Sequence, residues 1–117
     1  MQTDNVDIFQ EIKNILAEIL DIEATEVTPE SSLIKELRVK SIDFLELAAA
    51  LNANFNIEVN EEDVFLRDAE DRLKQAEKAA FPFLDGERQE EISGNPAAAV
   101  PKVKDLVSYV AWQLKKA

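Results

Sequence analysis

The chain has 117 residues, contains no cysteine and no histidine, and carries a formal charge of -11 from 24 acidic and 13 basic residues. This length suffices to bury one hydrophobic core without crosslinks, so we expect a single domain over residues 1–117. The composition excludes thiolate metal sites, thiol nucleophiles and histidine bases, and the negative charge disfavours nucleic acid as a partner.

The first predicted helix covers residues 8–20, where apolar residues recur at the spacing of one helix face. The next segment, from Asp21 to Lys40, is too long for an ordinary connector, and its residues 28–31 are typical of a turn or a short helical start. We expect Leu33, Ile34 and Leu37 to attach this long loop to the core.

The second predicted helix begins at Ser41, ends at Phe55 and carries two separate apolar strips. The strip that we assign to the core consists of Phe44, Leu47, Ala48, Leu51 and Phe55. The other strip, beside Ser41, consists of Ile42, Leu45, Ala49 and Ala53. This second strip either offers a docking surface or packs on the long loop or on a later segment, and the periodicity leaves both possibilities open.

The acidic excess lies in the first part of the chain. Residues 1–66 hold 15 acids and 4 bases, residues 67–117 hold 9 of each, and from Ser41 to Leu66 there are six acids and no base. Such a field suits a partner with a basic face, and a solvated acidic surface explains the charge equally well.

Asn60 and the three acids after it predict the capped start of a third helix, whose apolar stripe continues to about Ala80. The run 81–84 ends this helix, because a proline disfavours helical backbone in the residue before it. Residues 85–101 contain both glycines and predict a loop. A last helix follows from about Lys102. Its inward residues are Val103, Leu106, Val107, Val110, Ala111 and Leu114.

Ser41 is the strongest candidate for a functional residue, because a serine at a helix start has two uses. Its hydroxyl can cap the helix, or it can carry a covalent anionic group that the free amides and the helix dipole favour. Other sites lack support, since residues 21–26 place Glu26 where a calcium loop needs glycine. Gly86 and Gly94 are the only glycines, which excludes glycine-rich phosphate loops, and no carboxylate pair stands out as catalytic.

The order of parts resembles the acyl carrier protein family, with a helix, a long loop, a helix that begins with serine, an acidic helix start and a final helix. In this resemblance Ser41 corresponds to the family's attachment serine, Leu37 to the loop leucine before it and Ile42 to the apolar residue after it. The further matches are Glu46, Leu47, Leu51 and Phe55. The resemblance covers about residues 8–64 and 103–114.

The resemblance implies an all-α, acyl-carrier-protein-like four-helix bundle with an extended third helix and an inserted loop at about 66–101. It implies that Ser41 receives 4'-phosphopantetheine from coenzyme A, and that the thiol of this arm holds acyl groups as thioesters for enzymes of lipid or fatty-acid biosynthesis. The chain itself would catalyse nothing and hold no metal. The candidate acyl groove consists of Phe44, Leu47, Leu51, Val64 and Phe65. The candidate docking residues are Ile42, Asp43, Leu45, Glu46 and Ala49.

The implied partners are a phosphopantetheinyl transferase and the acyl-loading and acyl-transferring enzymes, which would meet the carrier through basic or apolar docking faces. We expect a monomer. The longest apolar run, residues 47–51, is far below membrane-spanning length and no targeting segment is visible, so we expect a cytoplasmic protein without membrane insertion. Alternatives are polyketide or aminoacyl cargo, an unmodified helical interaction module in which Ser41 only caps its helix, and an enzyme that uses buried carboxylates.

Three features depart from the family pattern. Arg38 and Lys40 stand where the family has glycine and aspartate, so modification would need a dedicated transferase. Residues 52–54 replace the acidic end of the family's second helix, which shifts docking toward the apolar strip beside Ser41. The insertion at about 66–101 extends the helical structure passively, extends or covers the acyl pocket, or contacts a particular partner.

Overall fold

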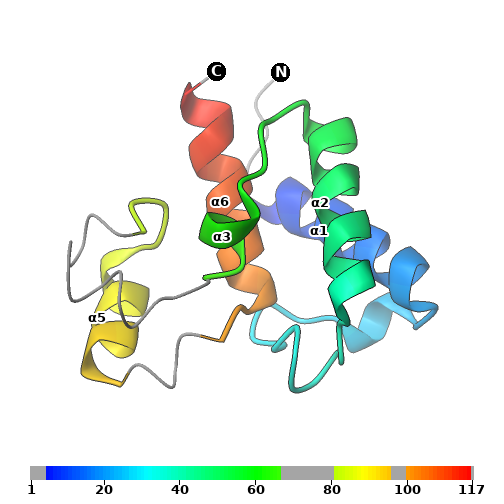
Figure 1. Cartoon of the computed structure of the whole chain (residues 1–117), viewed down its shortest axis with the longest axis horizontal. Coiled ribbons are helices and arrows are strands. Elements are labelled where there is room, and N and C mark those ends of the chain that lie inside the picture. The colour runs from blue at the N-terminus through cyan, green and yellow to red at the C-terminus, as the bar shows by residue number, and fades with distance from the viewer. Residues whose placement is uncertain (1–4, 67–80, 96–99, 117) are drawn as a thin grey trace.

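The computed structural model describes residues 5–66, 81–95 and 100–116, and its regular structure is helical (Figure 1). The elements in chain order are α1 (Asn5–Leu20), the 3-10 helix η1 (Ala24–Glu26), α2 (Ser41–Phe55), α3 (Glu61–Val64), α5 (Gly86–Gly94) and α6 (Val103–Lys116). Within the described ranges there is no strand, and an isolated bridge pairs Ser32 with Lys102. The predicted all-α class is confirmed.

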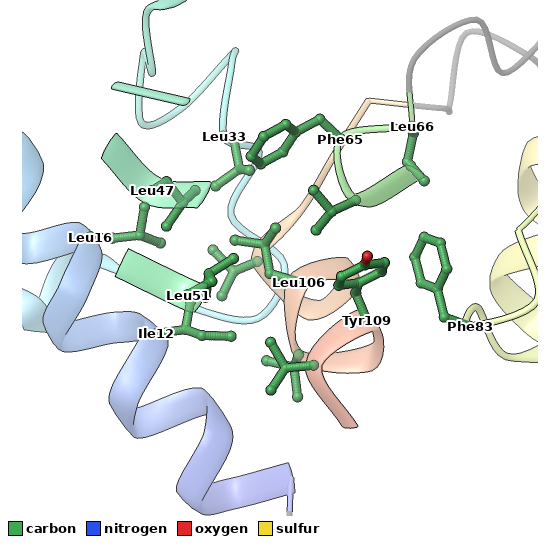
Figure 2. Packing of buried hydrophobic residues seen from close by; sticks show 14 of the residues in the cluster. Ile12, Leu16, Leu33, Leu47, Leu51, Phe65, Leu66, Phe83, Leu106 and Tyr109 are labelled. Atoms are coloured by element: carbon green, nitrogen blue, oxygen red, sulfur yellow. The ribbon is translucent and has the colours of Figure 1, made fainter. Parts of the chain in front are cut away.

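Helices α1, α2 and α6 enclose one cluster of buried side chains, and the short α3 packs on α6 (Figure 1). Figure 2 shows Ile12 and Leu16 of α1, Leu47 and Leu51 of α2, and Leu106 of α6 within this core, each at most 1% exposed. Burying an aliphatic side chain of this size contributes about 1.5–3 kcal/mol. The helical periodicity in the sequence therefore identified the inward faces of these three helices correctly.

The end of α2 and the start of α3 follow from two asparagines. Asn56 takes a left-handed backbone (φ 54°), which asparagine tolerates better than most residues, and its amide donates to the Asn52 carbonyl (2.9 Å). The side chain of Asn60 accepts a hydrogen bond from the Glu62 amide (3.0 Å). The predicted cap of the third helix is confirmed.

The long loop before α2 is attached to the chain just before and at the start of α6. The Leu33 amide donates to the Pro101 carbonyl (3.0 Å), and the Val103 amide donates to the Ser31 carbonyl (3.0 Å). Leu33 is fully buried and Leu37 is half-buried, as predicted, but Ile34 is 50% exposed. The prediction for Ile34 is wrong, because Leu33 takes the inward position of this tight turn and its neighbour faces solvent.

The third helix is shorter than predicted over the residues that the structure describes. Helix α3 ends at Val64, and Leu66 has φ 54°, a backbone conformation that a right-handed helix does not contain. The prediction of an unbroken helix is therefore wrong at Leu66. Residues 67–80, where we placed the remainder of that helix, lie outside the described residues.

The predicted loop at 85–101 is wrong for Gly86–Gly94, which form α5 on the side of α6 away from α1 and α2 (Figure 1). Asp85 caps this helix by accepting the Arg88 amide (2.8 Å). Ile92 is fully buried, so one apolar side chain anchors an otherwise polar segment. With so few apolar residues the segment showed no helical stripe in the sequence.

A buried ion pair fixes α5 to α6. The Arg88 guanidinium is 3% exposed and donates to both carboxylate oxygens of Asp105 (3.0 Å each), and it also binds the Val100 carbonyl (2.9 Å) and the Glu91 carboxylate. Burial alone lowers the pKa of Arg88, but the hydrogen bonds and charges of Asp105 and Glu91 outweigh it and hold this pKa above its usual value. The arginine therefore stays charged, and its ion pair with Asp105 holds α5, part of the insertion predicted at about 66–101, against α6.

An aromatic contact links the inserted segment to the body of the protein. The ring of Phe83 meets the ring of Tyr109 edge to face, with 5.1 Å between ring centroids, as Figure 2 shows. The Tyr109 hydroxyl accepts the Asn60 amide (3.0 Å) and donates to the Glu58 carbonyl (3.3 Å). Tyr109 thus joins the insert to the connection between α2 and α3.

Among the described residues, none of the helices has both the length and the apolar character that a membrane crossing requires.

We predict that Arg88→Ala lowers the free energy of unfolding by about 3 kcal/mol, because it leaves the buried Asp105 carboxylate without its partner. Urea unfolding followed by circular dichroism measures the change. The matched control is Glu90→Ala, which removes an exposed charge from the same helix and shifts stability by about 0.5 kcal/mol at most. Equal unfolding midpoints for the two variants would contradict the structural role of the ion pair.

Candidate functional site

Ser41 is the first residue of α2 and does not cap it. The N-cap position belongs to Lys40, which has an extended backbone, and the first helical hydrogen bond runs from the Phe44 amide to the Lys40 carbonyl (3.0 Å). The Asp43 carboxylate, in the first turn of the helix, accepts a hydrogen bond from the Lys40 amide (2.9 Å) and so stabilises the helix start. The interpretation of Ser41 as a plain N-cap is therefore wrong, because Lys40 holds the N-cap position and Ser41 is already inside the helix.

The Ser41 side chain is exposed, and its hydroxyl forms no hydrogen bond with the residues that the structure describes. A serine that capped the helix would spend its oxygen on a backbone amide. Here no such bond has to be broken before the oxygen can react. The hydroxyl is therefore accessible to an enzyme that attaches a group to it.

The electrostatics of this helix start suit an anionic substituent on Ser41. The amides of Ser41 and Ile42 have no hydrogen-bond partner among the described residues, as expected for the first turn of a helix. These amides and the positive end of the helix dipole favour a negative group. Arg38 and Lys40 are exposed beside the serine and add positive charge. A phosphodiester is thus compatible with the residues present.

Arg38 occupies a backbone conformation that favours glycine. Its φ is 56°, in the left-handed region, where a side chain with a Cβ carries a penalty of about 1–2 kcal/mol. The family pattern places glycine at this position. Arg38 therefore adopts a backbone conformation for which glycine is the better-suited residue.

The candidate docking residues lie on the outer face of α2. Ile42 and Leu45 are 63% and 59% exposed, Ala49 and Glu46 are also exposed, and Asp43 is half-buried by its capping role. Of the two possibilities for the second apolar strip, packing on the loop or on the insert is thus wrong over the described residues. The strip faces solvent beside Ser41 and is available to a partner.

The five candidate acyl-groove residues are brought together in the core. They are at most 8% exposed and comprise Phe44, Leu47, Leu51, Val64 and Phe65. The rings of Phe44 and Phe65 meet edge to face with 4.5 Å between centroids, which closes the junction of α2 and the end of α3. Figure 2 shows the ring of Phe65 beside Leu33, on the side of the core where Leu47 of α2 lies. These residues are packed against one another, so an acyl chain would enter only by parting them.

A surface groove of about 540 Å³ lies elsewhere, between α1 and α2. Its lining residues are Glu11, Asn14, Ile15, Glu18, Ile19, Glu46, Ala50 and Asn54. The groove shares Glu46 with the docking face and none of its lining with the acyl-groove residues. In the described part of the chain, no cluster of side chains has the composition of a metal site.

Two residues near the site have roles that the sequence reasoning missed. Asp43, the third residue of α2, accepts the amide of the N-cap residue Lys40, and the only sequence signal for this bond is their spacing of three residues, as in a capping box. Tyr109 holds the link between α2 and α3 through its hydroxyl, whereas its place off the apolar stripe of α6 gave no indication of a partner.

Comparison with known proteins places this site within a described sequence family. The family pattern described as "phosphopantetheine attachment site" matches residues 10–69, just over half of the chain. The chain is 42% identical over 55 residues to the acyl carrier protein of Helicobacter pylori, covering 47% of this chain and 70% of that protein. It is 40% identical over 58 residues to the acyl carrier protein of Helicobacter hepaticus, covering 50% of this chain and 76% of that protein.

We expect Ser41→Ala to change the free energy of unfolding by about 0.5 kcal/mol at most, because the hydroxyl makes no bond that the fold uses. Asp43→Ala, which removes the hydrogen bond to the amide of the N-cap residue Lys40, lowers it by about 1 kcal/mol. Chemical denaturation of the two unmodified variants tests both values. A loss at Ser41 as large as that at Asp43 would show that the serine caps the helix after all.

Replacing Arg38 with glycine is expected to raise the free energy of unfolding by about 0.5–1 kcal/mol, since relief of the left-handed strain exceeds the added entropy of the unfolded chain. Arg38→Ala is the control, because it removes the same charge and keeps the Cβ. Thermal unfolding of the three proteins gives the comparison. If alanine stabilises as much as glycine, charge and not backbone strain governs this position.

Proposed function

We propose that Ser41 carries 4'-phosphopantetheine, because the chain belongs to the acyl carrier protein family. The observation that carries the assignment to this residue is its exposed hydroxyl, which no described residue binds, on the first residue of a helix inside the matched region. When attached, the arm supplies a thiol that holds acyl groups as thioesters. The chain acts as the carrier in this proposal and performs no catalysis of its own.

Attachment is a transfer from coenzyme A. The Ser41 oxygen forms a phosphoester bond with the phosphorus nearest the pantetheine, and the diphosphate bond of coenzyme A breaks. The adenosine bisphosphate half leaves with that bond's electron pair, and the hydroxyl proton passes to a base on the transferase. The chain contributes an accessible oxygen and a helix start that favours the resulting negative charge.

The proposed acyl pocket lies between α2 and α3, lined by Phe44, Leu47, Leu51, Val64 and Phe65. Helix α3 has only four residues, so parting it from α2 breaks few helical bonds. The main restraints on such movement are the ring contact between Phe44 and Phe65 and the hold of Tyr109 on Asn60. An acyl chain would replace the apolar contacts that it disrupts.

The proposed partners are a phosphopantetheinyl transferase and the enzymes that load and unload acyl groups. They would dock on Ile42, Leu45 and Ala49, with Asp43 and Glu46 as the acidic part of the face. We keep lipid or fatty-acid biosynthesis as the proposed pathway, with polyketide or aminoacyl cargo as the alternative. A cytoplasmic, monomeric carrier of a single domain remains part of this proposal.

The mass of the intact protein tests the attachment. Incubation with coenzyme A, magnesium and a phosphopantetheinyl transferase should add one phosphopantetheine to the wild type and none to Ser41→Ala. The serine variant is a fair control, because the hydroxyl is not used by the fold. Digestion and fragment sequencing should locate the added mass on Ser41.

Two results would contradict the proposal. Wild-type protein from its native host that is active and uniformly bare would show that no arm is needed. Full function of Ser41→Asn in cells would favour the unmodified interaction module, since asparagine cannot accept the arm.

A further inference from the structure

The loop that leads into α2 carries three cations close to Ser41 in the chain. Lys35, Arg38 and Lys40 are exposed, and none of them forms an ion pair within the described residues. Elsewhere, Arg88 binds Asp105 and Lys104 binds Glu30 (3.0 Å), so these two cations are used by the fold. The three cations near Ser41 therefore stabilise no described contact and are free to meet an external partner.

Hydrogen bonds within the loop bring its two ends together. The Val39 amide donates to the Leu33 carbonyl (2.8 Å), and the Leu37 amide donates to the Ser32 carbonyl (3.0 Å). Residues just after Leu33 and residues just before Ser41 therefore belong to one compact turn. The three cations belong to this turn, which leads directly into α2 at Ser41.

Exposed apolar side chains concentrate in the same segment. The large hydrophobic residues that are exposed in the described part of the chain are Ile34, Ile42 and Leu45, and all of them lie between positions 34 and 45. Their exposed fractions are 50%, 63% and 59%. Apolar side chains surrounded by unpaired charges are typical of a surface that a partner covers. The partner must therefore offer apolar contacts as well as charge.

The charge changes sign along this surface. Residues 35–40 hold three cations and one acid, Glu36, a net charge of +2, while the segment from Ser41 to Leu66 contains six acids and no base, with Glu46 bordering the apolar strip. A partner that closes over Ser41 thus meets positive charge on the loop side and negative charge farther along α2. A uniformly basic docking face would be repelled by residues 35–40, whose net charge is positive.

We propose that the transferase acting on Ser41 presents carboxylates to Lys35, Arg38 and Lys40 and an apolar recess to Ile42 and Leu45. This inference rests on the proposed function and specifies its first partner. The transferase is the partner concerned because it must reach the Ser41 oxygen itself and so covers the adjacent residues. Enzymes that act on the distant thiol have no such requirement.

Kinetics of coenzyme A-dependent modification by the phosphopantetheinyl transferase of the native host test this inference. Lys40→Glu is expected to lower kcat/KM about tenfold, mainly through KM, because charge reversal at a docking surface slows association. The matched control is Lys115→Glu, an exposed reversal near the end of α6, which should change kcat/KM less than about twofold. For the wild type, added salt should lower kcat/KM.

The variant should remain folded, because the bond from Lys40 to Asp43 uses the backbone amide and a glutamate suits the positive end of a helix. Circular dichroism checks this point, and Lys40→Gln should give an intermediate kcat/KM. An unchanged or higher kcat/KM for Lys40→Glu overturns the inference, while mass gain on wild-type Ser41 leaves the proposed function intact. Failure of the wild type to gain mass overturns both.

Discussion

The start of α6 is the point on which the geometry of both the site and the insert depends. On one side, Val103 and the preceding Pro101 bind the backbone of the long loop at Ser31 and Leu33, and this loop leads into α2. On the other side, Asp105 binds Arg88 of α5 and also accepts the Lys102 amide (3.0 Å). One turn of helix therefore positions the segment that precedes Ser41 and anchors the inserted segment, although the two are far apart in the sequence.

Asp43 forms the hydrogen bond that closes the start of α2, and the Ser41 hydroxyl forms none, so the same oxygen is not needed both for capping and for attachment of a group. A serine that caps a helix gives its oxygen to a backbone amide, and a group attached to that oxygen would compete with the cap. In this chain the helix starts one residue earlier than a serine cap would place it, and the carboxylate of Asp43, in the first turn, accepts the amide of the N-cap residue Lys40. The Ser41 hydroxyl lies at the positive end of the helix dipole and forms no hydrogen bond with the described residues. Asp43 thus stabilises the helix start without involving the Ser41 hydroxyl.

Much of the fold could be predicted because local patterns decide it. Helical spacing identified α1, α2 and α6, and Asn56 and Asn60 marked where α2 ends and α3 begins. Helix α5 was missed because the buried partner of Arg88 lies 17 residues away, and no local pattern reports a contact of that kind. Position 41 was recognised as a helix start, but its exact place in the first turn depends on the Asp43 bond, which became evident only in three dimensions.

The inserted segment is connected to the proposed acyl pocket by a chain of direct contacts. Phe83 packs on Tyr109, whose hydroxyl binds the backbone on both sides of the link into α3, at Glu58 and Asn60. The residue that follows α3, Phe65, then packs on Phe44 in the first turns of α2. Movement of α3 away from α2 would therefore disturb the hydrogen bonds of the Tyr109 hydroxyl, and Phe83 of the insert helps to hold the Tyr109 ring in place. If the proposed acyl pocket lies between α2 and α3, the insert packs on a residue that holds one of its walls, which favours a role for the insert at this pocket over a passive extension.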